Sequence, residues 1–123
     1  MVRENLKGAC LCSAVQFEVA ATPSEIIRCH CRMCQKAHGA PFATFARFRH
    51  EDFSVTAGAE SIATYRSSDV AQRTFCRECG LSLQFMRDGA GTFGLAISAL
   101  DSPLEPQPLR DYHQGSRSEW QAR

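Results

Sequence analysis

The chain has 123 residues, of which 44% are hydrophobic and 22% charged, and its formal net charge is +1. This length and composition are typical of a single folded domain and exclude a disordered or fibrous chain. The basic residues are scattered singly, no apolar run approaches the roughly 20 residues of a membrane span, and the start lacks a secretory leader. We therefore expect a cytoplasmic protein that contacts neither nucleic acid nor a membrane.

Apolar and polar residues follow each other in a pattern that predicts a mainly β chain with one short helix. Alternation over residues 15–19 indicates a half-buried strand, and EIIRCHC is a second extended stretch. Residues 32–38 are acceptable helix formers, and Gly39 followed by Pro41 predicts the end of that helix. Further strands are expected in PFATFARF, SVTAG, IATYRS, AQRTF, LSLQFM and TFGLAISAL, with HEDF as a single turn and RDGAG as a hairpin turn.

The segment from Asp101 onward holds three of the five prolines and shows no periodicity. We expect an irregular C-terminal tail there that crosses the surface, held by Tyr112 and Trp120 through burial of their rings. The chain contains no linker that would separate domains. The prediction is one domain over residues 1–123, with the irregular tail from about residue 101.

Seven cysteines are the most informative feature of the composition. An odd number cannot be closed into disulfides within one chain, and a reducing compartment keeps thiols free, so crowded cysteines favour a metal. Cys10 and Cys12 form C-x-C, which presents two sulfurs on one face of a strand. Cys76 and Cys79 form C-x-x-C before a glycine, a turn that directs two thiolates to one point. These four predict a closed structural zinc site, and the alternative is a set of buried apolar cysteines.

Cys29, Cys31 and Cys34 lie within six consecutive positions and form the second group. Zinc sites with three protein ligands typically keep the fourth position for water or substrate, so this group predicts a catalytic site. His38 is the alternative fourth ligand, because it follows Cys34 by four residues on the same face of the expected helix. With His38 bound, the site would be closed and structural. His30 lies between two ligands on an extended stretch and should point away from the metal.

Three cations surround the second group of cysteines: Arg28, Arg32 and Lys36. Three thiolates around Zn²⁺ leave a net charge of −1, which these cations would offset while offering donors to an anionic ligand, although they fit a solvated face equally well. A soft thiolate-bound metal prefers sulfur as its added ligand, and coordination deprotonates an incoming thiol near neutral pH. The expected substrate is therefore a thiol.

Five stretches carry a family resemblance: GACLCSAVQFE, CHCRMCQK, HGAPF, FCRECG and ALDSPLEP. They resemble the glutathione-dependent formaldehyde-activating enzymes, a family grouped with centromere-protein-V-like proteins, and the seven cysteines have that family's order and spacing. The resemblance implies a mainly β, single-domain tent fold of small antiparallel sheets with one or two short helical turns and two zinc ions. By this resemblance the structural zinc is held by Cys10, Cys12, Cys76 and Cys79, and the catalytic zinc by Cys29, Cys31 and Cys34.

The resemblance also implies an activity, a zinc-dependent carbon–sulfur lyase or synthase that joins glutathione and formaldehyde into S-hydroxymethylglutathione, a detoxification reaction. Arg28, Arg32 and Lys36 are then the candidates for contacting the carboxylates of glutathione or a related thiol. Phe42, Phe45 and Phe48 are candidates for lining the pocket, although such a stripe is more often core. A non-catalytic, zinc-stapled binding module is the alternative function, and the sequence leaves a homo-oligomer open.

Three positions depart from the family's pattern. Ser13 stands where the family usually has a glycine, Leu81 where it has a small hydroxyl residue, and Ala99 where it has serine, threonine or glycine. None of the three is an expected metal ligand. The departures therefore leave the predicted fold unchanged and bear on the substrate alone.

Overall fold

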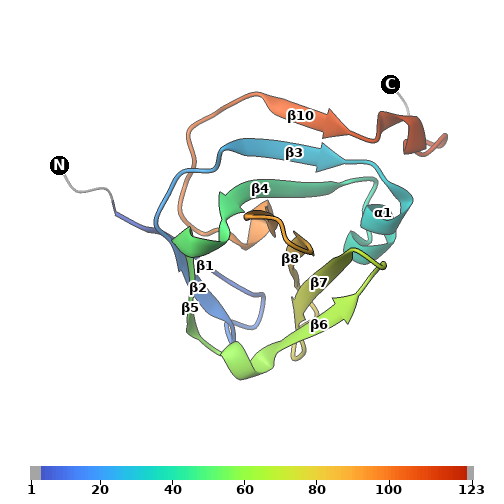
Figure 1. Cartoon of the computed structure of the whole chain (residues 1–123). Helices are drawn as coiled ribbons and strands as arrows, with labels where there is room; N and C mark the ends of the chain where they lie inside the picture. The colour runs from blue at the N-terminus through green and yellow to red at the C-terminus, as the bar shows by residue number, and fades with distance from the viewer. Residues whose placement is uncertain (1–3, 122–123) are drawn as a thin grey trace.

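The computed structural model describes residues 4–121, which form ten strands in two sheets and one α-helix (Figure 1). The smaller sheet has the order β1-β2-β5, and the larger one the order β10-β3-β4-β9-β8-β7-β6. The bounds are β1 Leu6–Ala9, β2 Gln16–Val19, β3 Glu25–Cys29, α1 Arg32–His38, β4 Ala43–Arg49, β5 Phe53–Ala57, β6 Ile62–Arg66, β7 Ala71–Cys76, β8 Ser82–Arg87, β9 Thr92–Ala96 and β10 Leu109–Tyr112. The mainly β fold predicted from the sequence is confirmed.

The single helix begins and ends where the sequence predicts. Cys31 is its N-cap residue, because the Cys31 sulfur accepts a hydrogen bond from the backbone N–H of Cys34 at 3.3 Å. Gly39 ends the helix in the left-handed conformation, with φ of +58°, which a glycine adopts without steric cost. The turn at His50–Asp52 and the hairpin between β8 and β9 are also confirmed.

Part of the segment expected to be irregular is a strand. β10 pairs in parallel with β3, and all other pairings between the named strands are antiparallel. Tyr112 is half-buried and donates a hydrogen bond to Glu25 at 2.8 Å, as a ring that holds the tail would. The expectation for Trp120 is wrong, because its side chain is 73% exposed.

The larger sheet has two faces with different roles, because successive side chains of a strand point to opposite sides. On one face Ala46, Phe48, Phe93 and Leu95 pack against Phe17 and other residues of the smaller sheet and form the main hydrophobic core. On the opposite face Phe45 packs with Cys29, Cys34 and neighbouring residues in a second cluster. The fold thus separates a structural core from a second apolar surface that reaches the cysteines at α1.

Gly58 and Gly94 are among the glycines that lie where the backbone comes close to other groups. A Cβ on Gly58, whose φ is +79°, would lie 1.8 Å from the carbonyl oxygen of Ala14 in the loop between β1 and β2. A Cβ on Gly94 in β9 would lie 3.0 Å from the ring of Phe45, on the face of the sheet opposite the main core. At Gly58 the missing side chain therefore lets the loop over residues 10–15 approach the end of β5. At Gly94 it leaves room for the ring of Phe45.

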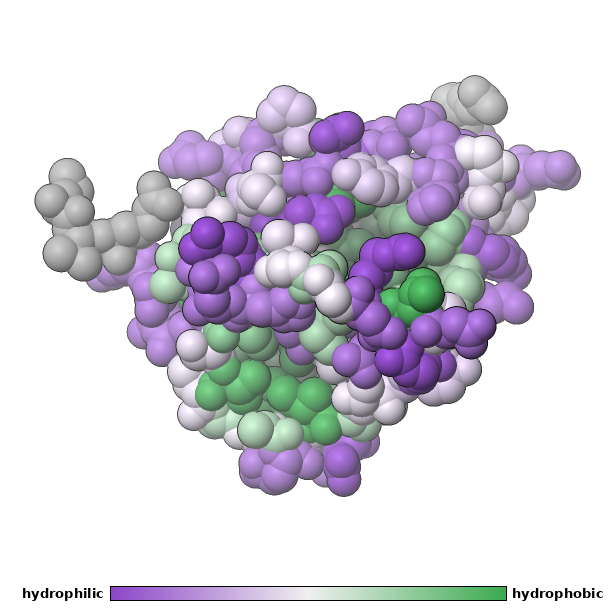
Figure 2. Space-filling model, viewed as in Figure 1, coloured by the Kyte–Doolittle hydropathy of each residue, from purple (hydrophilic) through white to green (hydrophobic). Residues whose placement is uncertain are grey.

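Polar residues cover most of the molecular face drawn in Figure 2, and apolar residues gather in two places, below its centre and to the right. Within residues 4–121, the helical segments are all too short or too polar to cross a bilayer.

Candidate metal centres

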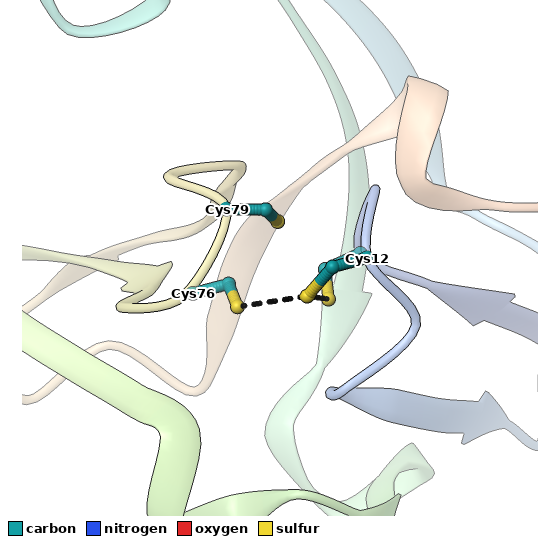
Figure 3. Close-up of side chains that lie close together, drawn as sticks. Cys12, Cys76 and Cys79 are labelled. Atoms are coloured by element: carbon teal, nitrogen blue, oxygen red, sulfur yellow. Dashed lines mark hydrogen bonds between the residues drawn. The ribbon is translucent and has the colours of Figure 1, made fainter.

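The first group of cysteines lies where the loop between β1 and β2 meets the turn between β7 and β8. Figure 3 shows Cys76 and Cys79 projecting from that turn toward Cys12. The sulfur of Cys12 is 3.6 Å from that of Cys10 and 3.8 Å from that of Cys76, and all four sulfurs lie within 4.8 Å of one another. A tetrahedral zinc site with Zn–S bonds of about 2.3 Å separates its sulfurs by about 3.8 Å. The four residues therefore fit a closed tetrahedral metal site.

The backbone around this quartet, Cys10, Cys12, Cys76 and Cys79, stabilises thiolates. The Val15 N–H donates to the Cys10 sulfur at 3.3 Å. Backbone hydrogen bonds from Leu81 and Cys12 lower the pKa of Cys79 to about 6. Since the thiolate is the form of cysteine that binds metal, these donors favour coordination.

Two residues in the turns that carry the quartet have a left-handed backbone. Gly80 has φ of +80°, as expected for the glycine after C-x-x-C. Ser13 has φ of +66°, a left-handed conformation that is costly for a residue with a side chain. The first departure from the family's pattern thus falls at a position where the backbone itself favours glycine.

The second group, the trio Cys29, Cys31 and Cys34, lies at the junction of β3 and α1. Its three sulfurs are within 4.8 Å of one another, and no histidine, aspartate or glutamate of residues 4–121 joins them in that group. Cys29 and Cys34 are buried and Cys31 is partly exposed. The trio fits a metal site with three protein ligands and one further coordination position.

The chemistry of the trio also favours a cation. A hydrogen bond with Cys34 lowers the pKa of Cys29, while the hydrogen bond with Cys29 and then burial raise the pKa of Cys34. Two close thiolates repel each other, so with no cation between them one keeps its proton. A bound metal ion would remove that conflict.

Two histidines flank the trio in the sequence, and neither belongs to its group of sulfurs. The His38 ring packs edge-on against Phe45 with centroids 5.2 Å apart, and burial followed by the charge of Arg73 lowers its pKa to about 4. His30 is buried, contacts the Phe42 ring and hydrogen-bonds Asp111 at 2.9 Å through Nε2. The expectation that His30 points away from the metal is confirmed.

A cavity of about 480 Å³ adjoins the trio, on the face of the larger sheet that lies opposite the main core. All three cysteines of the trio line it, together with apolar side chains that include Ile27, Phe45 and Phe85. Gly94 also lines it, so the missing side chain noted above contributes to its volume. Its volume is within the range of pockets for small molecules, about 300–1,000 Å³. Phe42 and Phe48 are not among its lining residues, so of the three candidate phenylalanines only Phe45 contributes.

Three arginines line the same cavity: Arg47, Arg73 and Arg87. Arg47 donates from Nε to Glu25 at 3.0 Å, which compensates its charge. Arg73 donates to the sulfur of Cys34 at 3.4 Å and lies over the Phe85 ring, 4.7 Å from its centroid. The cavity therefore places cationic side chains beside the trio.

The three cations predicted from the sequence lie outside the cavity lining. Arg28 makes two hydrogen bonds to Asp111, at 2.8 and 2.9 Å, and these lower the pKa of Asp111. Arg32 donates to the side chain of Gln35 at 3.0 Å, and Lys36 is exposed on α1. Their contact with a substrate stays a prediction.

Sequence reasoning missed the cavity arginines. Alternation in AQRTF indicates that Ala71 and Arg73 share a face of one strand. The alternation does not reveal which face of the sheet these two residues occupy, because that depends on how β7 pairs with β8 and on where β3 lies in the same sheet. The spacing of the cysteines needs no such knowledge, and the division of seven sulfurs into four and three is confirmed.

A model of the glutathione-dependent formaldehyde-activating enzymes matches residues 5–116, so the chain belongs to this family. A crystal structure of a Rhodobacter sphaeroides protein is similar in fold, with a TM-score of 0.69 and 28% sequence identity. That similarity covers 85% of this chain and 98% of the other.

Two fungal proteins illustrate the sequence similarity. An uncharacterized lyase of Schizosaccharomyces pombe is 32% identical over 64% of this chain and 56% of its own length. A Podospora anserina protein named "Putative glutathione-dependent formaldehyde-activating enzyme" is 34% identical over 60% of this chain and 36% of its own length. The chain thus matches about half or less of the length of these relatives.

Proposed function

We propose that this protein joins a thiol to an aldehyde, with glutathione or a related thiol and formaldehyde as the substrates, as a zinc-dependent carbon–sulfur lyase or synthase. In the forward direction the thiol sulfur bonds to the carbonyl carbon, the carbonyl π bond breaks, and the thiol proton ends on the new hydroxyl oxygen. Membership of the family supports glutathione-dependent formaldehyde activation. The observation that carries the proposal is the opening of the three-sulfur group into a cavity of ligand size.

Zinc is the metal proposed for both groups, one structural ion on the quartet and one catalytic ion on the trio. A zinc ion held by Cys29, Cys31 and Cys34 would supply Lewis acidity and a fourth position suited to sulfur. The walls of the cavity are largely apolar, and an apolar environment strengthens electrostatic interactions within it. Arg73 adds positive charge beside Cys34, where the incoming sulfur would carry negative charge.

Turnover of the Cys31→Ala variant is the direct test. Cys31 is the partly exposed member of the trio, and its loss should reduce thiol-dependent turnover to the nonenzymatic rate, while the variant keeps its fold and one zinc per chain. The assay follows formation of the hydroxymethyl thioether from glutathione and formaldehyde, with the uncatalysed rate subtracted. Arg49→Gln is the matched control, because Arg49 is 63% exposed and outside the cavity lining.

Unchanged turnover in Cys31→Ala would reject the assignment of the trio. Absence of turnover above the uncatalysed rate in the zinc-loaded wild type would favour the alternative, a zinc-stapled binding module. X-ray absorption separates the two proposals further, since only the enzyme requires the number of sulfur neighbours per zinc to rise when a thiol is added.

A further inference from the structure

We infer that Arg73 and Arg87 form a carboxylate-binding subsite in the cavity, which selects thiol substrates that carry a carboxylate over uncharged thiols. This inference rests on the function proposed above and assigns to it a substrate class and two specificity residues. It differs from the sequence prediction, which assigned the carboxylates to Arg28, Arg32 and Lys36 near α1.

Arg73 is positioned to bind an anion. Its guanidinium lies over the Phe85 ring and uses one N–H on the sulfur of Cys34. A guanidinium carries five N–H donors in a rigid fork, so further donors are available to a ligand. Stacking on the ring fixes the plane of this fork and reduces the entropy lost on binding.

Arg87 reaches the same cavity from the neighbouring strand. In the register of β7 and β8, Arg73 lies opposite Phe85 and Ala71 lies opposite Arg87. Arg73 and Arg87 are therefore diagonal neighbours on one face, at a Cα separation of about 7–8 Å. Two cations at this spacing suit one carboxylate between them, or two carboxylates on a small peptide.

No protein carboxylate competes for these two arginines within residues 4–121. The ion pairs of the described chain join Arg28, Arg47, Arg49, Arg66 and Arg110 and His30 to acidic partners, and neither Arg73 nor Arg87 belongs to any of them. The described cavity lining holds no aspartate and no glutamate. A largely apolar cavity with two cations that no carboxylate neutralises attracts anions, because the low-dielectric walls weaken the screening of the charges.

Proximity to the trio links this subsite to the proposed reaction. Arg73 touches Cys34 directly, so a ligand whose carboxylate binds Arg73 has its other end within reach of the three sulfurs. A thiol with a carboxylate a few bonds away, such as glutathione, satisfies both requirements at once. An uncharged thiol satisfies only the contact at the sulfurs.

The test measures equilibrium binding of S-methylglutathione and of its dimethyl ester to the zinc-loaded protein by calorimetry. Neither probe has a free thiol, so binding does not depend on turnover. Wild type should bind the acid about 10-fold to 100-fold more tightly than the ester, as expected for a charge-assisted pair in a sheltered site. Arg73→Gln and Arg87→Gln should each remove most of this preference, Arg73→Lys should keep part of it, and Arg49→Gln should keep it in full.

Zinc content is measured for every variant, so that loss of metal is not mistaken for loss of the subsite. Equal binding of acid and ester by wild type would overturn the inference. A preference that survives in both glutamine variants but is lost in Lys36→Gln would also overturn it and move the carboxylate site to α1. If the preference follows Arg73 and Arg87 but no turnover is found, the subsite stands and the proposed function fails. If turnover is found without the preference, the proposed function stands and the subsite fails.

Discussion

Replacement of Cys76 by alanine should destabilise the protein far more than replacement of Cys31, although each removes one sulfur from a metal group. The reason is the length of chain that each group joins. The quartet links Cys12 to Cys76, which are 64 positions apart. The trio takes all three sulfurs from residues 29–34 of one short segment.

The expected magnitude follows from chain entropy. A cross-link that closes a loop of 64 residues removes about 4 kcal/mol of conformational entropy from the unfolded chain, by the relation used for disulfides. A whole domain is stable by about 5–15 kcal/mol, and structural zinc binds peptides with about 10–16 kcal/mol. Cys76→Ala should therefore lower the free energy of unfolding by about 4 kcal/mol or more, which leaves a marginal fold or none.

Urea unfolding followed by circular dichroism measures the effect, with zinc per chain measured on the same samples. Cys31→Ala is the matched comparison and should lose one zinc while its free energy of unfolding falls by only about 1 kcal/mol, the cost of the lost helix cap. Equal destabilisation by the two substitutions would refute the argument from loop length. An unchanged midpoint in Cys76→Ala would refute the structural role of the quartet.

Three further predictions concern single residues. Because burial holds the pKa of His38 at about 4, below its ordinary 6.5, the unfolded chain binds more protons between these values. The contribution of neutral His38 to the free energy of unfolding should be full above pH 6.5 and should fall by about 2 kcal/mol toward pH 4, after allowance for partial solvent access. His38→Gln should reduce this dependence of stability on pH in urea titrations. An unaltered pH dependence would contradict the assignment. Gly58→Ala should cost about 3 kcal/mol or more, since it combines a left-handed φ with a clash against the Ala14 carbonyl, and a thermal midpoint equal to wild type would count against the described backbone. Ser13→Gly should raise stability by up to about 1 kcal/mol through relief of its left-handed backbone, and a lower midpoint would show that the hydroxyl contributes more than the strain costs.

The strands that sequence analysis found are those whose own residues alternate. β2 buries Phe17 and Val19 on one side, and this pattern is legible without knowledge of any partner. β10, with the sequence LRDY, has no such pattern. Its position depends on side chains far away in the sequence, through the pairs of Asp111 with Arg28 and of Tyr112 with Glu25, 83 and 87 positions apart. Local alternation cannot predict a strand held by distant ion pairs and hydrogen bonds.

The candidate site also combines residues that the local sequence predicts with residues that only the assembled fold reveals. Cysteines two positions apart on a strand, or three apart across a turn, direct their sulfurs to one side, so their spacing predicts the close pairs within both groups. A single arginine can face either side of its strand, and Arg73 acquires its place only when β7, β8 and Phe85 are assembled. The sequence predicts a buried ring at Trp120 because large aromatic side chains usually bury most of their surface, but in the fold this ring is 73% exposed.

Tyr112 and His113, which line the cavity, follow all of its other described lining residues in the order of synthesis. Tyr112 ends β10 and His113 follows it. β10 pairs with β3, a strand more than eighty positions earlier in the chain. A nascent chain on the ribosome can thus gather both sets of sulfurs well before it can enclose the chamber next to the trio. The lining of the cavity is complete only after residue 113 has emerged, so any chemistry that needs the whole lining must wait until synthesis has passed that residue.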